Sequence, residues 1–397
     1  MEAYVVEWLS LLVRWLHLIA GIAWIGASFY FIMLDNSLSK PAKAEDATRG
    51  VSGELWAVHG GGLYQSQKFL AGPRGEGLSN NLHWSKYEAY TTWLSGMGLL
   101  AIIYWFGAST YLIDKSVMAL TPVQAVGVSV ASIVGGWVIY HALCKLFGSN
   151  EKGLLALLFT FVIALDWGLF QVFSARAAFL HVGAVLGTIM AANVFFAIIP
   201  GQKKMVAQIR AGVEPDPEPG RVGKQRSVHN TYFTLPVLFI MISNHYPMTY
   251  SHSYGWLILA VIMAAGALIR QFFVLRHRGQ TRSPFVVVAV LLLLAVFVVL
   301  APKSSSATTA GSVSFAQVRT VINARCITCH AAQPTFAGFA QPPKGVVLES
   351  TEQIMTHAQK INETVASRYM PIGNLTQMTD AERESIAAWF RDGAKVR

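Results

Sequence analysis

Five residues near the C-terminus, Cys326-Ile327-Thr328-Cys329-His330, place two thiols and one imidazole at the spacing of a haem attachment motif. In such a motif the two cysteines form thioether bonds to haem and the histidine is an axial ligand of the iron. A zinc or thiol-redox site is the alternative for this spacing, but no second pair of metal ligands accompanies it. The sequence therefore favours one covalently bound haem c and a function in electron transfer.

A low-spin haem also needs a sixth iron ligand, and a methionine is the obvious candidate. Met370 lies in a loop-like stretch and is followed by Pro371, as in small class I cytochromes c, which present a thioether sulfur in this way. Met355 and Met378 are weaker candidates. We therefore expect His330 and Met370 to bind the haem iron.

Composition indicates that most of the chain lies in lipid, because 53% of its residues are hydrophobic and only 13% are charged. A helix crosses a bilayer of roughly 30 Å with about 20 apolar residues. Runs of this kind lie at 8–34, 87–112, 123–147, 153–173, 178–200, 230–247, 253–275 and 284–301. The predicted fold is all-α, with a polytopic membrane bundle of about eight transmembrane helices and a small helical domain like a class I cytochrome c. Cys144, at the end of one run, is interpreted as a packing residue.

A change of composition after the last apolar run marks the domain boundary. A stretch rich in serine and threonine begins near Pro302 and is typical of a linker. We therefore divide the chain into a transmembrane domain (1–301), a linker (302–312) and a cytochrome c domain (313–397). In the last of these, we expect the final helix, opened by Thr379, to pack against a helix at 315–325.

The distribution of lysine and arginine predicts the orientation in the membrane, because basic loops stay on the cytoplasmic side. Loops after the first, third, fifth and seventh runs hold 17 basic residues, and the opposite loops hold only Lys115, Arg176 and Lys303. Both termini and the haem domain should therefore face the periplasm of a bacterial inner membrane. The net charge of +10 is an orientation signal, and no aromatic-interleaved basic patch suggests a nucleic acid partner.

Polar side chains inside the apolar runs are candidates for function, because lipid disfavours them. They form a periplasmic and a cytoplasmic layer. The periplasmic layer contains Arg14, His17, Asp166, Gln171, Arg176, His181, Asn244 and His245, and the cytoplasmic layer contains His83, Lys86, Glu88, His141, His229 and Asn230. Any single histidine there is as readily an interfacial anchor as a ligand.

The periplasmic layer has two functional interpretations. In one, its three histidines ligate a second haem, of b type, or another metal. In the other, an arginine fork holds an anionic ligand rich in carbonyl groups, with amides and tryptophans around it.

Long stretches of the chain resemble the membrane-bound bacterial urate hydroxylases, which join a urate oxidase N-terminal membrane domain to a C-terminal cytochrome c. The resemblance rests on Arg14-Trp15-Leu16-His17 through Gly26, His83-Trp84, Tyr87-Glu88-Ala89-Tyr90, His181-Val182-Gly183 through Phe196, His229-Asn230-Thr231-Tyr232 through Pro236, and Ser243-Asn244-His245-Tyr246-Pro247. It covers nearly the whole chain and is far more specific than the haem motif alone.

The resemblance implies an oxidoreductase of purine degradation that converts urate to 5-hydroxyisourate. Water would supply the oxygen, and electrons would leave through the cytochrome toward a respiratory acceptor, a cytochrome c or a terminal oxidase. The candidate catalytic residues are Arg14, His17, Asp166, Arg176, His181 and His245. A general base is also needed, and His17, Asp166, His181 or His245 can serve.

Two readings from other classes stay open. One is a membrane protein that oxidises a quinol or a metal ion, with histidines holding haem or copper. The other is a bundle that only anchors an electron-carrying cytochrome. The anchor is the weaker of the two, because a single span is enough to tether a domain.

Overall fold

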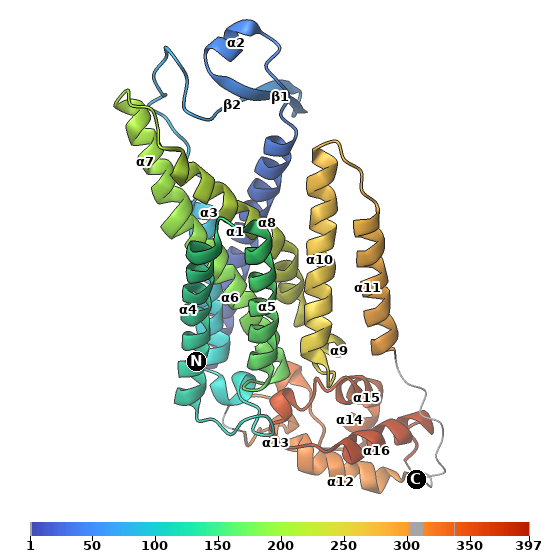
Figure 1. The fold of residues 1–397 in the computed structure, drawn as a ribbon. Coiled ribbons are helices and arrows are strands. Elements are labelled where there is room, and N and C mark those ends of the chain that lie inside the picture. Colours follow the sequence, from blue (N-terminus) through green and yellow to red (C-terminus); the bar gives the residue numbers. More distant parts are fainter. Residues whose placement is uncertain (1, 302–312, 337, 397) are drawn as a thin grey trace.

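The computed structural model describes residues 2–301, 313–336 and 338–396, and it forms two helical parts (Figure 1). Helices α1 to α11 make a long N-terminal bundle. Helices α12 to α16 make a small C-terminal domain at one end of that bundle. The predicted linker, 302–312, lies outside the described residues.

The bundle is built from helices, three short π-helical segments and one hairpin. Its elements are α1 (Glu2–Asn36), α2 (Ala44–Thr48), β1 (Val51–His59), β2 (Gly62–Phe69), α3 (Tyr87–Leu100), η1 (Ala101–Trp105), η2 (Ala108–Leu112), α4 (Pro122–Phe147), α5 (Glu151–Phe170), α6 (Ala175–Ala192), η3 (Asn193–Ile198), α7 (Ile199–Arg210), α8 (Pro217–Ser243), α9 (Pro247–Tyr250), α10 (Gly255–His277) and α11 (Pro284–Leu300).

Five helical stretches of the described chain are long and apolar enough to cross a membrane. They are Tyr4–Asn36, Pro122–Phe147, Glu151–Phe170, Ala175–Arg210 and Gly255–His277. The other three predicted spans fall on helices that do not meet the same test. The 87–112 run is divided into α3, η1 and η2, the 230–247 run is part of the more polar α8, and α11 is only 17 residues long.

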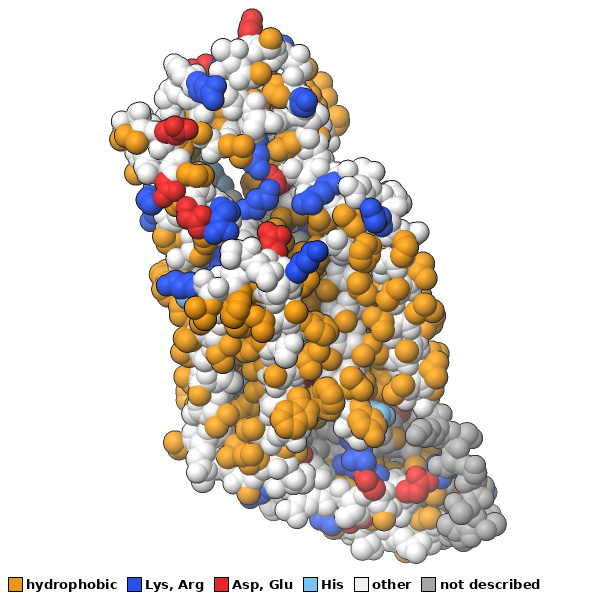
Figure 2. All heavy atoms as spheres, viewed as in Figure 1, with side chains coloured by type: hydrophobic (Ala, Val, Ile, Leu, Met, Phe, Trp, Pro, Cys, Tyr) orange, Lys and Arg blue, Asp and Glu red, His pale blue; other side chains and the backbone are white. Residues whose placement is uncertain are grey.

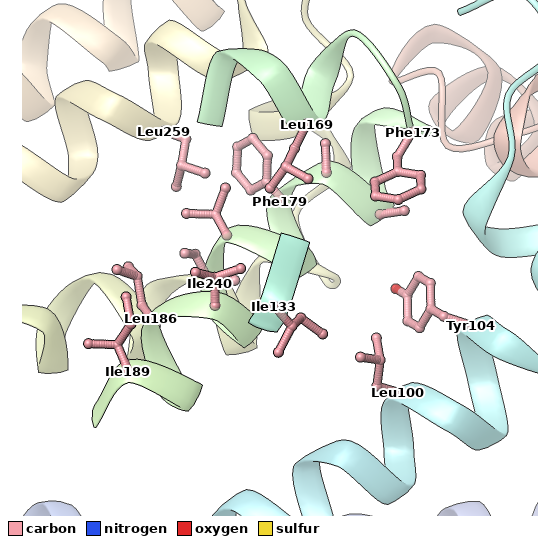
Figure 3. Close-up of a cluster of buried hydrophobic side chains, with 14 of the residues drawn as sticks. Leu100, Tyr104, Ile133, Leu169, Phe173, Phe179, Leu186, Ile189, Ile240 and Leu259 are labelled. Atoms are coloured by element: carbon pink, nitrogen blue, oxygen red, sulfur yellow. The ribbon is translucent and has the colours of Figure 1, made fainter. Parts of the chain in front are cut away.

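Helix α6 is the centre of the bundle because its side chains are buried around nearly the whole helix. Figure 3 shows Phe179, Leu186 and Ile189 of this helix meeting apolar side chains from its neighbours. Glycine permits two of these close approaches. A Cβ atom at Gly183 would lie 2.5 Å from Ile240 of α8, and one at Gly136 of α4 would lie 2.5 Å from Val185.

The bundle has an apolar belt and two different ends. Figure 2 shows hydrophobic side chains around the middle, with charged side chains gathered toward the two ends. We call the end beside the C-terminal domain the proximal end and the end with the β-hairpin the distal end (Figure 1). The proximal end contains the stretches 106–121, 171–174 and 244–254.

The distal hairpin is a correction to the predicted all-α fold. Strands β1 and β2 pair in antiparallel register, with Trp56 opposite Gln65. The turn uses Gly60 and Gly61, both at positive φ (57° and 82°), which is the conformation that tight hairpins prefer.

The C-terminal domain consists of α12 (Phe315–Arg325), α13 (Ile327–His330), η4 (Pro343–Gly345), α14 (Thr351–Thr356), α15 (Ala358–Ala366), η5 (Ile372–Asn374) and α16 (Asp380–Arg391). The predicted packing of the first helix on the last is confirmed. The rings of Phe315 and Trp389 lie 5.8 Å apart, and Arg325 forms an ion pair with Glu382. The predicted start of the last helix is also confirmed, since Thr379 and Glu382 form a capping box.

Candidate functional site

The Cys-x-x-Cys-His motif occupies a single helical turn, α13, which directly follows α12. The Nδ1–H of His330 donates a hydrogen bond to the carbonyl of Val346 at 2.9 Å, so Nε2 is left for a metal. Cys326 and Cys329 form no disulfide with each other. Burial, followed by the neighbouring Cys329, raises the pKa of the Cys326 thiol to about 12. A histidine fixed through Nδ1, with Nε2 open and two cysteines in the same helical turn, is the donor set that the predicted haem attachment needs.

The three methionine candidates for the sixth ligand lie in different surroundings. Met378 is 3% exposed and belongs to the apolar core of the domain, and Met355 packs against the same core. Met370 lies instead in the partly exposed loop 367–371, between α15 and η5. Of the three methionines, Met370 is therefore the candidate whose side chain does not pack in the core of the domain.

An arginine with aromatic neighbours lies at the proximal end of the bundle. Arg176, in the first turn of α6, donates from Nε to the Asn244 side chain at 3.1 Å. Its guanidinium lies 6.0 Å from the ring centroid of Tyr104 and 5.6 Å from that of Tyr111. Tyr250 is also close enough to interact with it electrostatically. We call Arg176, Asn244, Tyr104, Tyr111 and Tyr250 the arginine–tyrosine site.

This site contains polar groups that the protein itself does not satisfy. Tyr104 and Tyr250 are 2% and 3% exposed, and neither hydroxyl has a hydrogen-bond partner among the described residues. No ion pair of the described chain includes Arg176. Buried polar groups are normally paired, so unpaired donors around an unneutralised cation are the arrangement expected of an anion-binding site.

His181 is fully buried beside this site and is held in one tautomer. Its Nδ1 lies 2.7 Å from the Ala177 carbonyl, which can only accept, so Nδ1 carries the proton. Its Nε2 lies 2.6 Å from the Ser129 hydroxyl, which also accepts a hydrogen bond from Trp105 Nε1 at 2.9 Å. A neutral His181 can therefore take up a proton only at Nε2, by way of Ser129.

His17 faces α3, not the centre of the bundle. Its Nδ1 lies 2.9 Å from the Thr92 carbonyl and 3.1 Å from the Ser95 hydroxyl, so Nδ1 is the donor and Nε2 is left as an open acceptor. Arg14, one turn away on the same helix, is exposed and lies within electrostatic reach of Tyr104. The predicted inward face of Arg14 and His17 is thus directed at α3 and the edge of the arginine–tyrosine site.

The structure does not bring the whole predicted catalytic set together. Asp166 of α5 is fully buried, and its two carboxylate oxygens have no hydrogen-bond partner in the described chain. His245 is exposed in the loop after α8. No group of three His, Cys, Asp or Glu side chains in the described parts can hold a metal ion. A second haem or metal on His17, His181 and His245 stays a prediction.

Part of the predicted cytoplasmic layer forms a second polar network, at the distal half of the bundle. The Tyr140 hydroxyl lies 2.8 Å from His229 Nδ1 and accepts a hydrogen bond from Asn193 at 2.9 Å. Asn193 also donates to Asn230 at 2.9 Å. Arg226 lies over the Tyr140 ring, 3% exposed, with Nε and Nη1 unpaired in the described chain. Cys144 is buried nearby, which confirms it as a packing residue.

The tyrosines and Ser129 are the residues that the sequence did not reveal. Tyr104, Tyr111 and Tyr250 are common residue types near the ends of apolar helices, so their types alone carried no signal. The sequence shows only that these tyrosines lie near the ends of apolar runs, as Arg176 does.

Comparison with known protein families gives a match to the bundle. The model of the family described as urate oxidase N-terminal matches residues 3–301, which is the whole of the bundle. Searches among curated proteins and among solved structures found no match. The matched region covers well over half of the chain and contains Arg176, His181, His17 and the distal network. The chain therefore belongs to the urate oxidase N-terminal family, and it is a urate oxidase-related protein.

Proposed function

We propose that this protein oxidises urate to 5-hydroxyisourate at the proximal end of a membrane-embedded bundle and passes the electrons to a haem c in its C-terminal domain. Further transfer leads to a respiratory acceptor. In this proposal the proximal end and the C-terminal domain face the periplasm. The observation that carries the proposal is the arginine–tyrosine site, an unneutralised arginine among unsatisfied buried hydroxyls, next to the domain with the haem motif.

The site suits a planar, anionic purine. A guanidinium binds an anion with two parallel donors, and the Nη atoms of Arg176 are available for this because Asn244 uses only Nε. The hydroxyls of Tyr104 and Tyr250 can donate to carbonyl oxygens of the ring system. The rings of Tyr104 and Tyr111 can contact its flat faces.

The reaction must balance electrons and protons. Urate monoanion and one water give 5-hydroxyisourate monoanion, two protons and two electrons, with a new bond between C5 and the water oxygen. A single haem accepts one electron at a time, so the two electrons leave in succession. His17 Nε2 is an open proton acceptor, and His181 can take a proton through Ser129. When bound to Cys326, Cys329, His330 and Met370, haem would supply a one-electron acceptor beside the site.

Charge removal at the site is the direct test. Arg176→Gln should slow urate-dependent haem reduction by about a hundredfold or more, because it removes the anion-binding group from a buried site. Lys115→Gln is the matched control, since it removes one exposed cation from the same end of the bundle and should keep the normal rate. The measurement is anaerobic stopped-flow spectroscopy of the haem after mixing with urate.

Two outcomes would overturn the proposal. If Arg226→Gln or His229→Gln abolishes the reaction while Arg176→Gln does not, urate binds in the distal network. If urate fails to reduce the haem of the unaltered protein while a quinol does so, the protein is a quinol oxidase of the kind considered above.

A further inference from the structure

The loop that carries Met370 is held rigidly by the C-terminal domain. Arg383 of α16, only 8% exposed, donates from Nη1 to the carbonyls of Val365 (2.9 Å) and Met370 (2.7 Å). Its Nη2 donates to the Asn374 side chain at 3.2 Å. The Met370 N–H donates to the Thr364 carbonyl at 2.9 Å. Hydrogen bonds within the C-terminal domain thus hold this loop in place on both sides of Met370.

This loop touches the proximal end of the bundle without intervening side chains. A Cβ atom at Gly373 would lie 3.2 Å from the Thr110 carbonyl oxygen and 3.3 Å from that of Ile113. At a second point, a Cβ atom at Gly338 would lie 3.2 Å from Thr110 Oγ1. These distances are shorter than ordinary van der Waals contact. Gly373 therefore packs directly against the Thr110–Ile113 backbone, and Gly338 packs against the Thr110 side chain. In Figure 1 the C-terminal domain lies below the bundle.

The residue before Met370 reaches the arginine–tyrosine site. Tyr369 is half-buried and lies close enough to Arg176, Tyr111 and Tyr250 to interact with each of them electrostatically. Thr110 and Ile113, which Gly373 contacts, flank Tyr111 in the sequence. The same docking contact thus places Tyr369 beside the arginine–tyrosine site. Met370, the expected iron ligand, is the next residue in the sequence.

We propose that residues 368–374 are the docking surface of the C-terminal domain and that Tyr369 is a positioning residue that completes the arginine–tyrosine site. This rests on the proposed function. Each transfer removes one electron from bound urate and reduces the haem by one electron. Water adds to C5 and the two protons leave once both electrons are gone. The contact of Gly373 with Thr110 and Ile113 sets the distance over which each electron travels.

Two glycines of the C-terminal domain provide a matched test. Gly373 (φ 57°) and Gly345 (φ 68°) both have the left-handed backbone, so alanine adds similar strain at either position. A Cβ atom at Gly345 meets nothing within 4 Å, whereas one at Gly373 meets the bundle. We expect Gly373→Ala to slow urate-dependent haem reduction at least tenfold and Gly345→Ala to leave it near normal. Reduction by dithionite and the haem spectrum should be unchanged in both.

Tyr369 is tested in the same assay. Tyr369→Ala should raise the KM for urate and lower the rate of haem reduction. Tyr369→Phe should keep most of the rate, because the ring that positions the substrate remains. If Gly373→Ala and Tyr369→Ala both behave like the unaltered protein, the electron path does not cross this contact.

A disulfide tests the docking independently of urate. A Cβ at Gly338 would lie 3.2 Å from Thr110 Oγ1 and 2.5 Å from the edge of the Phe336 ring, so the ring must turn aside to admit a side chain. With that adjustment, the pair Thr110→Cys and Gly338→Cys should form a disulfide. A protease site inserted within 302–312 would then give two fragments that separate only after reduction. The pair Thr110→Cys and Gly345→Cys is the control and should stay unlinked. Absence of the first crosslink would refute the docking, whereas a crosslinked protein that urate cannot reduce would refute only the proposed function.

Discussion

At the scale of single residues, Met370 and Met378 show how burial separates candidates that look equivalent in the sequence. Both follow the haem motif and both carry a thioether. Met378 fills the core that α12 and α16 share, whereas the Met370 loop is fixed through its backbone and leaves the side chain uncommitted. Met370 is therefore the better candidate for the iron ligand, because its side chain is not part of this core.

The two methionines should therefore respond differently to removal. Met370→Ala should lower the haem reduction potential and change the spectrum, because a thioether ligand raises the potential. Met378→Ala should keep the spectrum and lower the unfolding free energy of the C-terminal domain by about 2–5 kcal/mol, the usual cost of deleting a buried methionine side chain. Spectroelectrochemistry and denaturant titration measure the two effects. The reverse pattern would assign the ligand to Met378.

The sequence singled out the ionisable residues of the site, Arg176 and His181, but not its tyrosines or Ser129. Arg176 and His181 stood out because lipid disfavours them, and both lie at the proximal end as expected. Asp166 and His245 stood out for the same reason, but the Asp166 carboxylate has no hydrogen-bond partner in the described residues, and His245 is exposed in the loop after Asn244. Residue type shows that a group is unusual in an apolar run. It does not show which neighbour the group meets, because that depends on helix rotation and packing.

At the scale of elements, apolar runs predicted where helices lie but not how they are built. The 87–112 run is continuous in the sequence, yet the structure breaks it at Gly107 between two π-helical segments. There a Cβ atom would lie 2.5 Å from the Ile103 carbonyl. The run at 230–247 belongs to a helix that begins at Pro217, after a cap by Asp216. Hydropathy shows which stretch of a helix can lie in lipid. It does not show where a helix continues with polar residues, or where its hydrogen-bond pattern changes from α to π.

One ion pair, between Arg325 and Glu382, joins the helices α12 and α16 beside the haem motif. Burial alone would raise the pKa of Glu382, but hydrogen bonds from Thr379 and the interaction with Arg325 lower it below the ordinary value. A lowered carboxyl pKa stabilises the fold above the unfolded value of about 4.3, and this contribution is lost as the pH falls through the folded pKa.

Removal of the Glu382 charge should therefore matter only above that pH. Glu382→Gln should lower the unfolding free energy of the C-terminal domain by about 0.5–1 kcal/mol at pH 7, the range for a partly exposed pair. The difference from the unaltered protein should shrink as the pH falls below about 4.3 and vanish once the pH lies below the folded pKa of Glu382. Glu384→Gln, which removes an exposed pair with Arg391, should have no measurable effect at either pH. Denaturant titrations followed by haem absorption at both pH values would show this, and equal losses at both would exclude the ion pair as the cause.

At the scale of the whole molecule, the sequence predicted two parts but not their contact. Residue type and composition identify the haem motif, the apolar runs and the Ser/Thr-rich stretch between them. Docking instead involves two glycines of the C-terminal domain and, in the bundle, the Thr110 and Ile113 carbonyls and the Thr110 hydroxyl, none of which is distinctive in composition. Backbone-to-backbone contacts of this kind leave no pattern in a single sequence.

The arrangement of the ends gives a test of orientation. The structure places the C-terminal domain and Gly212, which lies between α7 and α8, at opposite ends of the bundle. A reporter active only in the periplasm should therefore differ between fusions after Arg397 and after Gly212, whichever way the protein inserts. The 17 basic residues in alternate loops, against three in the others, predict activity for Arg397 and silence for Gly212. The reversed pattern would keep the structure and invert the orientation, placing the arginine–tyrosine site on the cytoplasmic side, where c-type haem is not attached. Activity of both fusions would contradict the placement of the two ends itself.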